Sequence, residues 1–193
     1  MPESAAYQME RLGCDLYHWG GHDFLVTVDR FSGYIWTHRL SRTGTDQVTK
    51  ALTNIFQTFG YPVAIRTDNG PQFRGPFSKF CKDNGILHEP ASPYHPQSNG
   101  LAENAVKTCK KLREKAKRSG ITFEKALYAW TATPRADGAS PAFLLLGYHP
   151  RLLGLPRLAL PVPNPVVADR EQRNVSLYDK RGGKHLSLSL IHI

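Results

Sequence analysis

The sequence has few cysteines and lacks the common metal-binding and nucleotide-binding motifs. Its three cysteines, Cys14, Cys81 and Cys109, are far apart and form no CxxC pair. This argues against a disulfide framework and a cysteine zinc site, and it is typical of a reducing compartment. The eight histidines form no HExxH motif, and no phosphate-binding loop, dinucleotide fingerprint or Gly-x-Ser-x-Gly elbow is present. We therefore expect no small-molecule cofactor.

Long apolar runs are also absent. No stretch approaches the roughly 20 apolar residues that a membrane-spanning helix needs. The first residues show no basic segment followed by an apolar run, so the sequence predicts no secretory signal and no membrane partner. With 193 residues, 40% of them hydrophobic and 21% charged, the chain can form one well-packed domain with flanking sequence.

Positive charge is distributed unevenly along the chain. Through Ala102 there are nine Lys or Arg and nine Asp or Glu residues, whereas from Glu103 onward there are sixteen basic and seven acidic ones. The second half therefore carries the whole formal net charge of +9. A basic half indicates a polyanionic partner such as nucleic acid, although a solvated basic surface without a partner is the alternative.

The hydrophobic pattern predicts an α/β layer fold with a mixed sheet. Short segments rich in β-forming residues, separated by turn residues, predict strands at 12–19, 24–31, 34–40, 63–67 and 86–88. Helical periodicity predicts helices at 45–59, 73–84, 101–118, 123–131 and 141–146. We expect Thr43 or Thr45 to cap the first helix. The first three strands should form an antiparallel meander, because their connections are short.

Composition also predicts the domain limits. Residues 1–10 are expected to be a linker fragment and residues 11–153 the globular core. Four prolines within ten residues indicate an extended linker at 154–168. The polar and basic residues 169–193 are expected to be a tail that leads into a further, truncated module.

Asp68 lies at the expected end of a strand, in Arg-Thr-Asp-Asn-Gly-Pro-Gln-Phe. Strand ends that enter loops are where α/β folds present functional groups. The structural alternative is that Asp68 only shapes an Asp-Asn-Gly turn or caps the next helix.

Glu103 lies in the first turn of the expected helix 101–118, after a loop rich in Pro, Ser, Asn and Gly. Helical spacing places Glu103, Lys107, Lys110 and Lys117 on one face, opposite an apolar stripe formed by Leu101, Ala105, Cys109, Leu112 and Ala116. Such a face suits a carboxylate that binds metal beside lysines that bind phosphates. A solvated face with helix-dipole stabilisation and Glu–Lys pairing remains the alternative.

A third carboxylate should come from the meander, where Asp15 and Asp29 are rivals. Asp15 lies mid-strand among apolar neighbours, which is costly without a partner such as a metal ion. Asp29 adjoins a Ser-Gly turn, where a hydrogen bond or salt bridge would account for it. Carboxylates from separate elements can hold two Mg²⁺ ions about 3.5–4 Å apart, which bracket the attacking and leaving oxygens of a phosphodiester.

Taken together, these motifs resemble the catalytic core of retroviral and gypsy-type LTR retrotransposon integrases. The likeness covers roughly residues 11–151. Its marks, in order, are Gly-Cys-Asp-Leu-Tyr, Phe-Leu-Val-Thr-Val-Asp-Arg-Phe-Ser-Gly, Arg-Thr-Asp-Asn-Gly-Pro-Gln-Phe and Ser-Pro-Tyr-His-Pro-Gln-Ser-Asn-Gly-Leu-Ala-Glu. The 34 residues between Asp68 and Glu103 are within about one residue of the interval usual in that family.

The resemblance implies a ribonuclease H-like fold with a five-stranded mixed sheet flanked by helices. It implies that Asp15, Asp68 and Glu103 bind two Mg²⁺ ions, or Mn²⁺ in vitro, and that Asp29 is structural. It further implies 3′-end processing and strand transfer of element DNA into target DNA, by a homo-oligomer acting in the nucleus. The residues expected to contact DNA are Gln97, Asn99, Asn104, Lys107, Lys110 and Lys117.

Full-length relatives in this family also carry an N-terminal zinc domain and a C-terminal DNA-binding module. We therefore expect this chain to be a fragment of a polyprotein or of a decayed element. Two other interpretations stay open: a non-catalytic nucleic-acid-binding remnant of a mobile element, and a ribonuclease H-type nuclease. The second usually needs four acids, and only three are well placed here.

Overall fold

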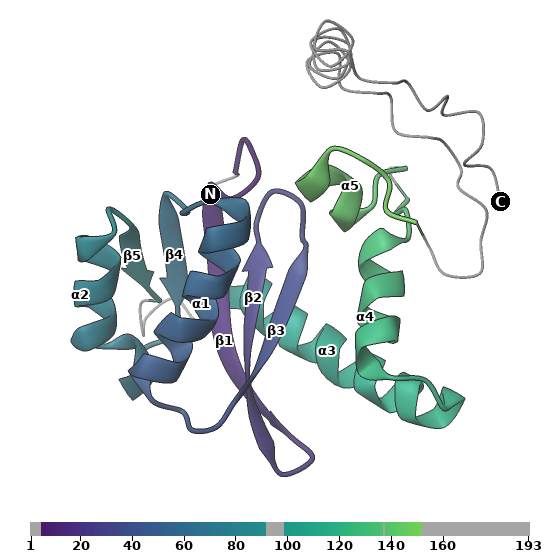
Figure 1. The fold of residues 1–193 in the computed structure, drawn as a ribbon, viewed down its shortest axis with the longest axis horizontal. Helices are drawn as coiled ribbons and strands as arrows, with labels where there is room; N and C mark the ends of the chain where they lie inside the picture. The colour runs from purple at the N-terminus through teal and green to yellow at the C-terminus, as the bar shows by residue number, and fades with distance from the viewer. Residues whose placement is uncertain (1–4, 92–98, 137, 152–193) are drawn as a thin grey trace, which may run out of the picture. The chain divides into compact units, whose positions relative to one another are not determined.

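The computed structural model describes residues 5–91, 99–136 and 138–151, which form a mixed sheet with helices on both faces (Figure 1). The strands are β1 (Arg11–Trp19), β2 (His22–Asp29), β3 (Ile35–Leu40), β4 (Ala64–Thr67) and β5 (Leu87–Pro90). The helices are α1 (Thr45–Phe59), the 3₁₀ turn η1 (Pro71–Phe73), α2 (Pro76–Asp83), α3 (Gly100–Ser119), α4 (Phe123–Ala132) and α5 (Pro141–Leu146).

The sheet has the strand order β3-β2-β1-β4-β5. Strands β1, β2 and β3 form the expected antiparallel meander, whereas β4 and β5 run parallel to β1. This five-stranded mixed sheet with flanking helices confirms the predicted fold class. β1 lies in the centre of the sheet and therefore has a hydrogen-bonded neighbour on each side.

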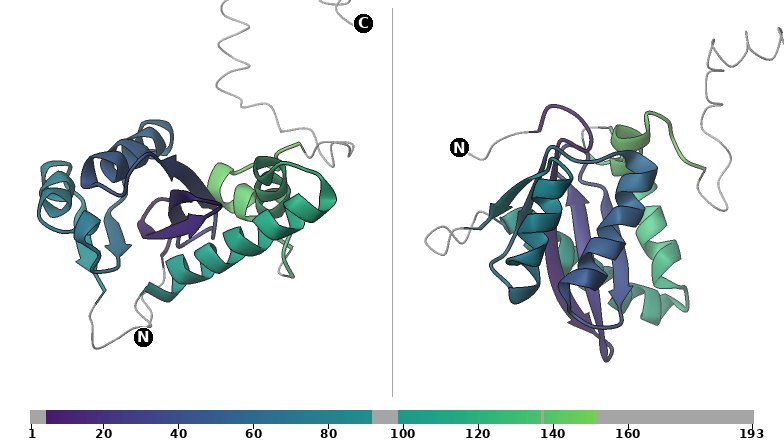
Figure 2. Two further views of the ribbon diagram at one scale, coloured as in Figure 1. Left: turned by 90° about the horizontal axis from the view of Figure 1, so that it is seen from below. Right: turned by 60° about the vertical axis from the view of Figure 1, so that its left-hand side comes forward.

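Two separate cores cover the two faces of the sheet. Helices α1 and α2 lie on one face, and α3 with α4 lies on the other (Figure 2). Side chains alternate along β1, so Leu12 and Cys14 join the α1–α2 core while Tyr17 joins the α3–α4 core. The odd-numbered positions of β1, Asp15 among them, consequently share the sheet face on which α3 packs.

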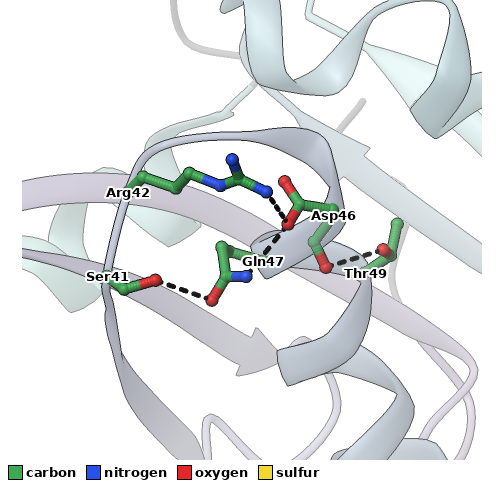
Figure 3. A network of polar contacts seen from close by, with 5 residues as sticks. All are labelled: Ser41, Arg42, Asp46, Gln47 and Thr49. Carbon is green, nitrogen blue, oxygen red and sulfur yellow. Dashed lines mark hydrogen bonds and ion pairs between the residues drawn. The ribbon is translucent and has the colours of Figure 1, made fainter.

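The start of α1 differs from the prediction that Thr43 or Thr45 caps it. The N-cap is Gly44, which has no side chain to cap with. The Thr45 hydroxyl donates instead to the carbonyl of Gln72 at 2.8 Å, which ties α1 to the η1 turn. Figure 3 shows how the helix start is held: Asp46 accepts hydrogen bonds from Arg42 at 2.6 Å and from the Gln47 amide at 2.9 Å. An acid in the first turn also stabilises the positive end of the helix dipole.

Other element boundaries shift by a few residues. The expected helix 73–84 is divided into η1 and α2, because Gly75, with a φ of 39°, breaks the chain direction before Pro76. β5 begins at Leu87 and extends to Pro90, later than expected. Within the described ranges, no helix is both long enough and apolar enough to span a membrane. The predicted linker 154–168 and tail 169–193 lie outside the described residues.

Candidate active site

Asp15 lies on β1, on the sheet face that packs against α3, and its side chain is half-buried. One carboxylate oxygen accepts a hydrogen bond from the backbone N–H of Leu16 at 2.7 Å. The pKa of Asp15 is raised to about 6, chiefly by burial and to a smaller extent by the negative charges of Asp68 and Glu103. The Leu16 hydrogen bond and the charge of Lys110 lower this pKa but do not offset the burial. The two other predicted acids and Lys110 therefore act on Asp15 electrostatically.

Asp68 directly follows β4, and the strand register places it beside Asp15. β1 and β4 pair in parallel, with Cys14 opposite Thr67, so the next residue of each strand is an acid. Asp68 accepts a hydrogen bond from the backbone N–H of Gly70 at 3.0 Å, which fixes the turn. The turn role and the functional role are thus compatible, since the bond uses one of the two carboxylate oxygens.

A chain of side chains that sequence reasoning missed holds the backbone at Asp68. The Thr67 hydroxyl donates to the Asp68 carbonyl at 2.8 Å, so the ring Nε2–H of His88 must donate to Thr67, at 2.9 Å. The other ring nitrogen then accepts from the Ser78 hydroxyl at 3.0 Å. Burial lowers the pKa of His88 and so favours the neutral ring that this arrangement requires. The relay connects α2 and β5 to the strand end that carries Asp68.

Glu103 is exposed in the first turn of α3, and its position depends on how that helix begins. Asn99, the residue before the helix, is 5% exposed and donates its side-chain amide to the carbonyl of Cys14 at 3.4 Å. The helix start is therefore linked to the strand residue next to Asp15. The amide of Asn99 thus anchors α3 to β1, and the expected contact of Asn99 with DNA stays a prediction.

A close approach of Gly13 and Ala102 brings α3 onto β1. A Cβ atom placed on Gly13 would lie 3.3 Å from Cγ1 of Val28 and 3.5 Å from Cβ of Ala102. Ala102 itself is fully buried. Small residues on both elements thus allow the helix to pack directly on the strand, two residues before Asp15 and one residue before Glu103. The Gly-Cys-Asp motif shows that a small residue precedes Asp15, but only the fold shows that Gly13 packs against Ala102.

The three acids do not close into a complete metal-binding cluster. Among residues 5–91, 99–136 and 138–151, no three His, Cys, Asp or Glu side chains gather closely enough to hold a metal ion. Asp15 lies on β1 and Asp68 directly follows β4, the strand paired with it, whereas Glu103 belongs to the separate helix α3. The structure therefore brings the acids into electrostatic range of one another, and their predicted role as metal ligands stays a prediction.

Asp29, the rival first acid, is fully buried and its carboxylate is engaged in the structure. One oxygen accepts from the backbone N–H of Met9 at 3.0 Å, and the other accepts from the backbone N–H of Ser32 at 2.8 Å and from its hydroxyl at 2.5 Å. These bonds confirm the expected turn role of Asp29. They also fasten the segment before β1 to the β2–β3 turn.

The two faces of α3 match the predicted division. Ala105, Cys109 and Ala116 are buried, and Leu101 and Leu112 are partly buried against the α3–α4 core. On the opposite face the predicted polar residues Asn104, Lys107, Lys110 and Lys117 are all exposed. Gln97, the remaining residue predicted to contact DNA, lies outside the described residues.

Arg113 holds α3 against its neighbours, a role that sequence reasoning also missed. Its guanidinium lies 3.9 Å from the ring centroid of Phe24 and 3.8 Å from that of Phe123, and it donates to the Tyr17 hydroxyl at 3.2 Å. A cation between two aromatic faces joins β2, α3 and α4. The sequence held one indication of this role: Arg113 is a charged residue directly beside Leu112, which belongs to the apolar stripe of the helix.

Comparison with known proteins identifies this region. Residues 10–96 match the integrase core domain family. The chain is 36% identical over 99 residues to the Gag-Pro-Pol polyprotein of squirrel monkey retrovirus, covering 51% of this chain and 5% of that protein. It is 33% identical over 139 residues to the Gag-Pol polyprotein of avian reticuloendotheliosis virus, covering 68% of this chain and 12% of that protein. The chain thus spans a small part of the curated relatives that it matches.

Solved structures share the fold. The catalytic core domain of bovine immunodeficiency virus (BIV) integrase is 25% identical with a TM-score of 0.60, covering 72% of this chain and 95% of that one. A chain of the simian T-cell lymphotropic virus intasome, in complex with PP2A regulatory subunit B56 gamma, is 22% identical with a TM-score of 0.67. The match covers 86% of this chain and 62% of that one. The HTLV-2 integrase catalytic core domain in complex with magnesium is 21% identical with a TM-score of 0.60. The match covers 72% of this chain and 97% of that one. The fold is therefore ribonuclease H-like, and this chain carries an integrase core domain of the retroviral and retrotransposon type.

Proposed function

We propose that this chain catalyses divalent-metal-dependent phosphoryl transfer on DNA, in the two forms of 3′-end processing and strand transfer. The observation that carries the proposal is the electrostatic coupling of Asp15 to Asp68 and Glu103, which come from three separate elements. Like-charged carboxylates on one sheet face repel one another, and a bound cation removes that repulsion.

The donor set suits hard divalent cations. All three predicted ligands are carboxylates, and Mg²⁺ and Mn²⁺ favour oxygen ligands. When bound, such ions polarise the scissile phosphodiester and lower the pKa of the attacking water or 3′-hydroxyl. Asp15 and Asp68 are held by the sheet and its turn, whereas Glu103 is carried by α3. The magnesium in the HTLV-2 relative supports this choice of metal.

The exposed face of α3 would then hold the DNA backbone. Lys110 acts electrostatically on Asp15, so this lysine lies near the acids, and Lys107 precedes it by about one helical turn. Phosphate contacts position the strand without selecting its sequence. Asn104, beside Glu103, would add a neutral hydrogen-bond donor. Assembly with further copies of the chain on DNA ends, in the nucleus, belongs to the same proposal.

Strand transfer on a branched DNA that mimics the joined product tests the catalytic proposal. With Mg²⁺ or Mn²⁺, we expect the 193-residue chain to be active, and we expect Asp15→Asn, Asp68→Asn and Glu103→Gln each to abolish activity. Asp83→Asn is the matched control, because Asp83 is an exposed carboxylate on α2 paired with Lys79. Thermal melting with and without metal gives a second readout, and Mg²⁺ should stabilise the unsubstituted chain more than Asp68→Asn.

A non-catalytic DNA-binding remnant is the second candidate. It is favoured by the absence, among the described residues, of a closed group of three metal-binding side chains. Under this alternative the chain binds DNA, yet neither metal stabilises it and no transfer occurs. Robust cleavage of RNA–DNA hybrids would instead favour a ribonuclease H-type nuclease.

A further inference from the structure

The ring of His88 lies between α2 and β4, on the sheet face opposite α3 (Figure 1). His88 pairs with Ile65 across the β4–β5 ladder and shares its face, and Ile65 belongs to the α1–α2 core. The fully buried Phe77 packs edge-on against the ring, with the centroids 5.0 Å apart. The two ring nitrogens contact the hydroxyls of Thr67 at 2.9 Å and Ser78 at 3.0 Å. Packing therefore fixes the ring, and both of its nitrogens are engaged.

The directions of the hydrogen bonds allow one neutral tautomer of His88. The Thr67 hydroxyl has a single proton, which it donates to the Asp68 carbonyl at 2.8 Å. Its oxygen must then accept from His88, which places the ring proton on Nε2. With the proton on Nδ1, Nε2 would accept the Thr67 proton, and the Asp68 carbonyl would lose this donor. The state of His88 thus decides whether Thr67 holds the carbonyl of Asp68.

The backbone at Asp68 depends on this side chain because the strand ladders end just before it. Thr67 is the last residue of β4 in either ladder, opposite Cys14 on β1 and Pro90 on β5. The peptide group after Asp68 lies past both ladders, and the Thr67 hydroxyl orients its carbonyl. The Asp68 carboxylate accepts from the backbone N–H of Gly70 at 3.0 Å. Rotation of the intervening peptide group would therefore also move the donor that holds the carboxylate.

We infer that His88 is a positioning residue for Asp68, acting through the Thr67 hydroxyl to hold the carboxylate in the direction from which it binds a metal ion. The identity of the bound species, a divalent metal ion, rests on the proposed function. A group that orients a metal ligand contributes to the affinity without touching the ion. The alternative is a packing role, in which the ring and Phe77 only hold α2 on the sheet.

Three substitutions separate these two roles. His88→Leu removes both ring nitrogens but keeps an apolar side chain against Phe77. His88→Gln retains an amide N–H that can donate to Thr67, and Thr67→Val removes the hydroxyl at nearly constant shape. Cys81→Ala is the matched control, because Cys81 is fully buried on α2 in the same core but takes no part in the Ser78–His88–Thr67 relay. It should lower the stability of this layer through lost packing alone.

Hydrogen exchange at the Gly70 amide, followed by NMR on the full 193-residue chain in EDTA, reports on Asp68 without metal or activity. This amide donates to the Asp68 carboxylate. We expect exchange to be about three- to tenfold faster in His88→Leu and Thr67→Val, the size expected for weakening one hydrogen bond. His88→Gln should recover most of the protection. Cys81→Ala should leave it unchanged after correction for global stability. Nitrogen shifts of the His88 ring in the same samples should show the Nε2–H tautomer, and an Nδ1–H tautomer would contradict the relay.

Mn²⁺ binding in the absence of DNA, measured from the electron spin resonance signal of the unbound ion, is the second arm. We expect His88→Leu to weaken binding on the order of tenfold, at the low end for a residue that supports a ligand, because it acts through the backbone. Thr67→Val should do the same, and the double variant should lose no more than either single one, since both interrupt one path. His88→Gln should bind nearly as well as the unsubstituted chain.

The outcomes separate this inference from the proposed function. In a chain that binds Mn²⁺, an unchanged Gly70 exchange rate or an unchanged Mn²⁺ affinity in His88→Leu would overturn the inference, as would equal changes in Cys81→Ala. Faster Gly70 exchange in the relay variants of a chain that binds no Mn²⁺ would support the positioning of Asp68 and contradict the proposed function. Metal-dependent strand transfer with His88→Leu equal to the unsubstituted chain in both arms would do the reverse.

Discussion

Gly13 and Ala102 face each other closely across the β1–α3 interface, where a single added Cβ on Gly13 would already touch its neighbours. The Cβ of Ala102 would lie 3.5 Å from a Cβ on Gly13, and Val28 closes the remaining space at 3.3 Å. Because Asp15 lies two residues after Gly13 and Glu103 one residue after Ala102, the spacing of strand and helix also sets the spacing of two acids.

Gly13→Val should therefore push α3 away from β1. We expect a loss of about 1–3 kcal/mol in the free energy of unfolding, which is typical of overpacking, together with a loss of metal-dependent strand transfer. Chemical denaturation and the branched-DNA assay measure the two effects. Gly100→Ala is the control at the same helix start, where a new Cβ meets nothing within 4 Å. Equal stability of the two variants would contradict the packing argument.

Asp15→Asn should stabilise the metal-free protein at neutral pH. The pKa of Asp15 is raised to about 6 from an ordinary value of 3.8, so folding favours the protonated form. Its stabilising contribution is complete below about pH 4 and is lost as the pH rises through 6. The Asn variant should then gain on the order of 1 kcal/mol at pH 7.5, after allowance for solvent screening, and almost nothing at pH 4.

Urea unfolding in EDTA at the two pH values measures this gain, and Asp83→Asn should show none. Added Mg²⁺ should reverse the order at pH 7.5, because the cation stabilises only the protein that retains Asp15. An Asn variant that is less stable than the unsubstituted chain at pH 7.5 without metal would refute the electrostatic account of this site.

Arg113→Ala should loosen the junction of β2, α3 and α4. Removing a guanidinium stacked between Phe24 and Phe123 costs about 1–3 kcal/mol, partly from the cation–π contacts and partly from lost packing. Arg113→Lys keeps the charge but not the planar stack, so we expect it to recover only part of the loss. Lys115→Ala, on an exposed position of the same helix, should change the unfolding free energy by less than about 0.5 kcal/mol.

The three cysteines should be inert in the folded protein. All are buried, and burial raises the pKa of Cys14 to about 12 and those of Cys81 and Cys109 to about 11. The thiolate that attacks a disulfide reagent is thus scarce at pH 8. We expect no rapid reaction with such a reagent in the native state and three reactive thiols in denaturant. Fast labelling of one thiol under native conditions would show that its element opens readily.

Local patterns predicted much of this structure. The 2-residue and 3.6-residue periodicities predicted the five strands and the five α-helices, but not the separate η1 turn before α2. Asp68 and Glu103 were predicted for the same reason: a turn motif and a first helical turn are local. The choice of Asp15 over Asp29 as the third acid depended on the family resemblance. The physical evidence for that choice, the hydrogen bonds that Asp29 accepts from Met9 and Ser32, is visible only in the structure.

Long-range partners were beyond the sequence patterns. Asn99 bonds to a carbonyl 85 residues away, and Gly13 contacts Ala102, so neither pairing leaves a local signal. The relay from Ser78 through His88 to Thr67 joins three elements whose packing only the fold determines. The N-cap of α1 at Gly44 was not predicted, because the Thr45 hydroxyl donates to a carbonyl in the η1 turn and does not cap the helix.

The position of β1 at the centre of the sheet has a consequence for how the sequence can vary. Leu12 and Cys14 are fully enclosed by one core, while Gly13 and Tyr17 are enclosed by the other. Successive residues of β1 therefore pack against different neighbours, and substitution at any of positions 12–14 disturbs one of the two cores. A saturation library should find this tripeptide among the least substitutable segments of the chain, even in variants selected for folding alone.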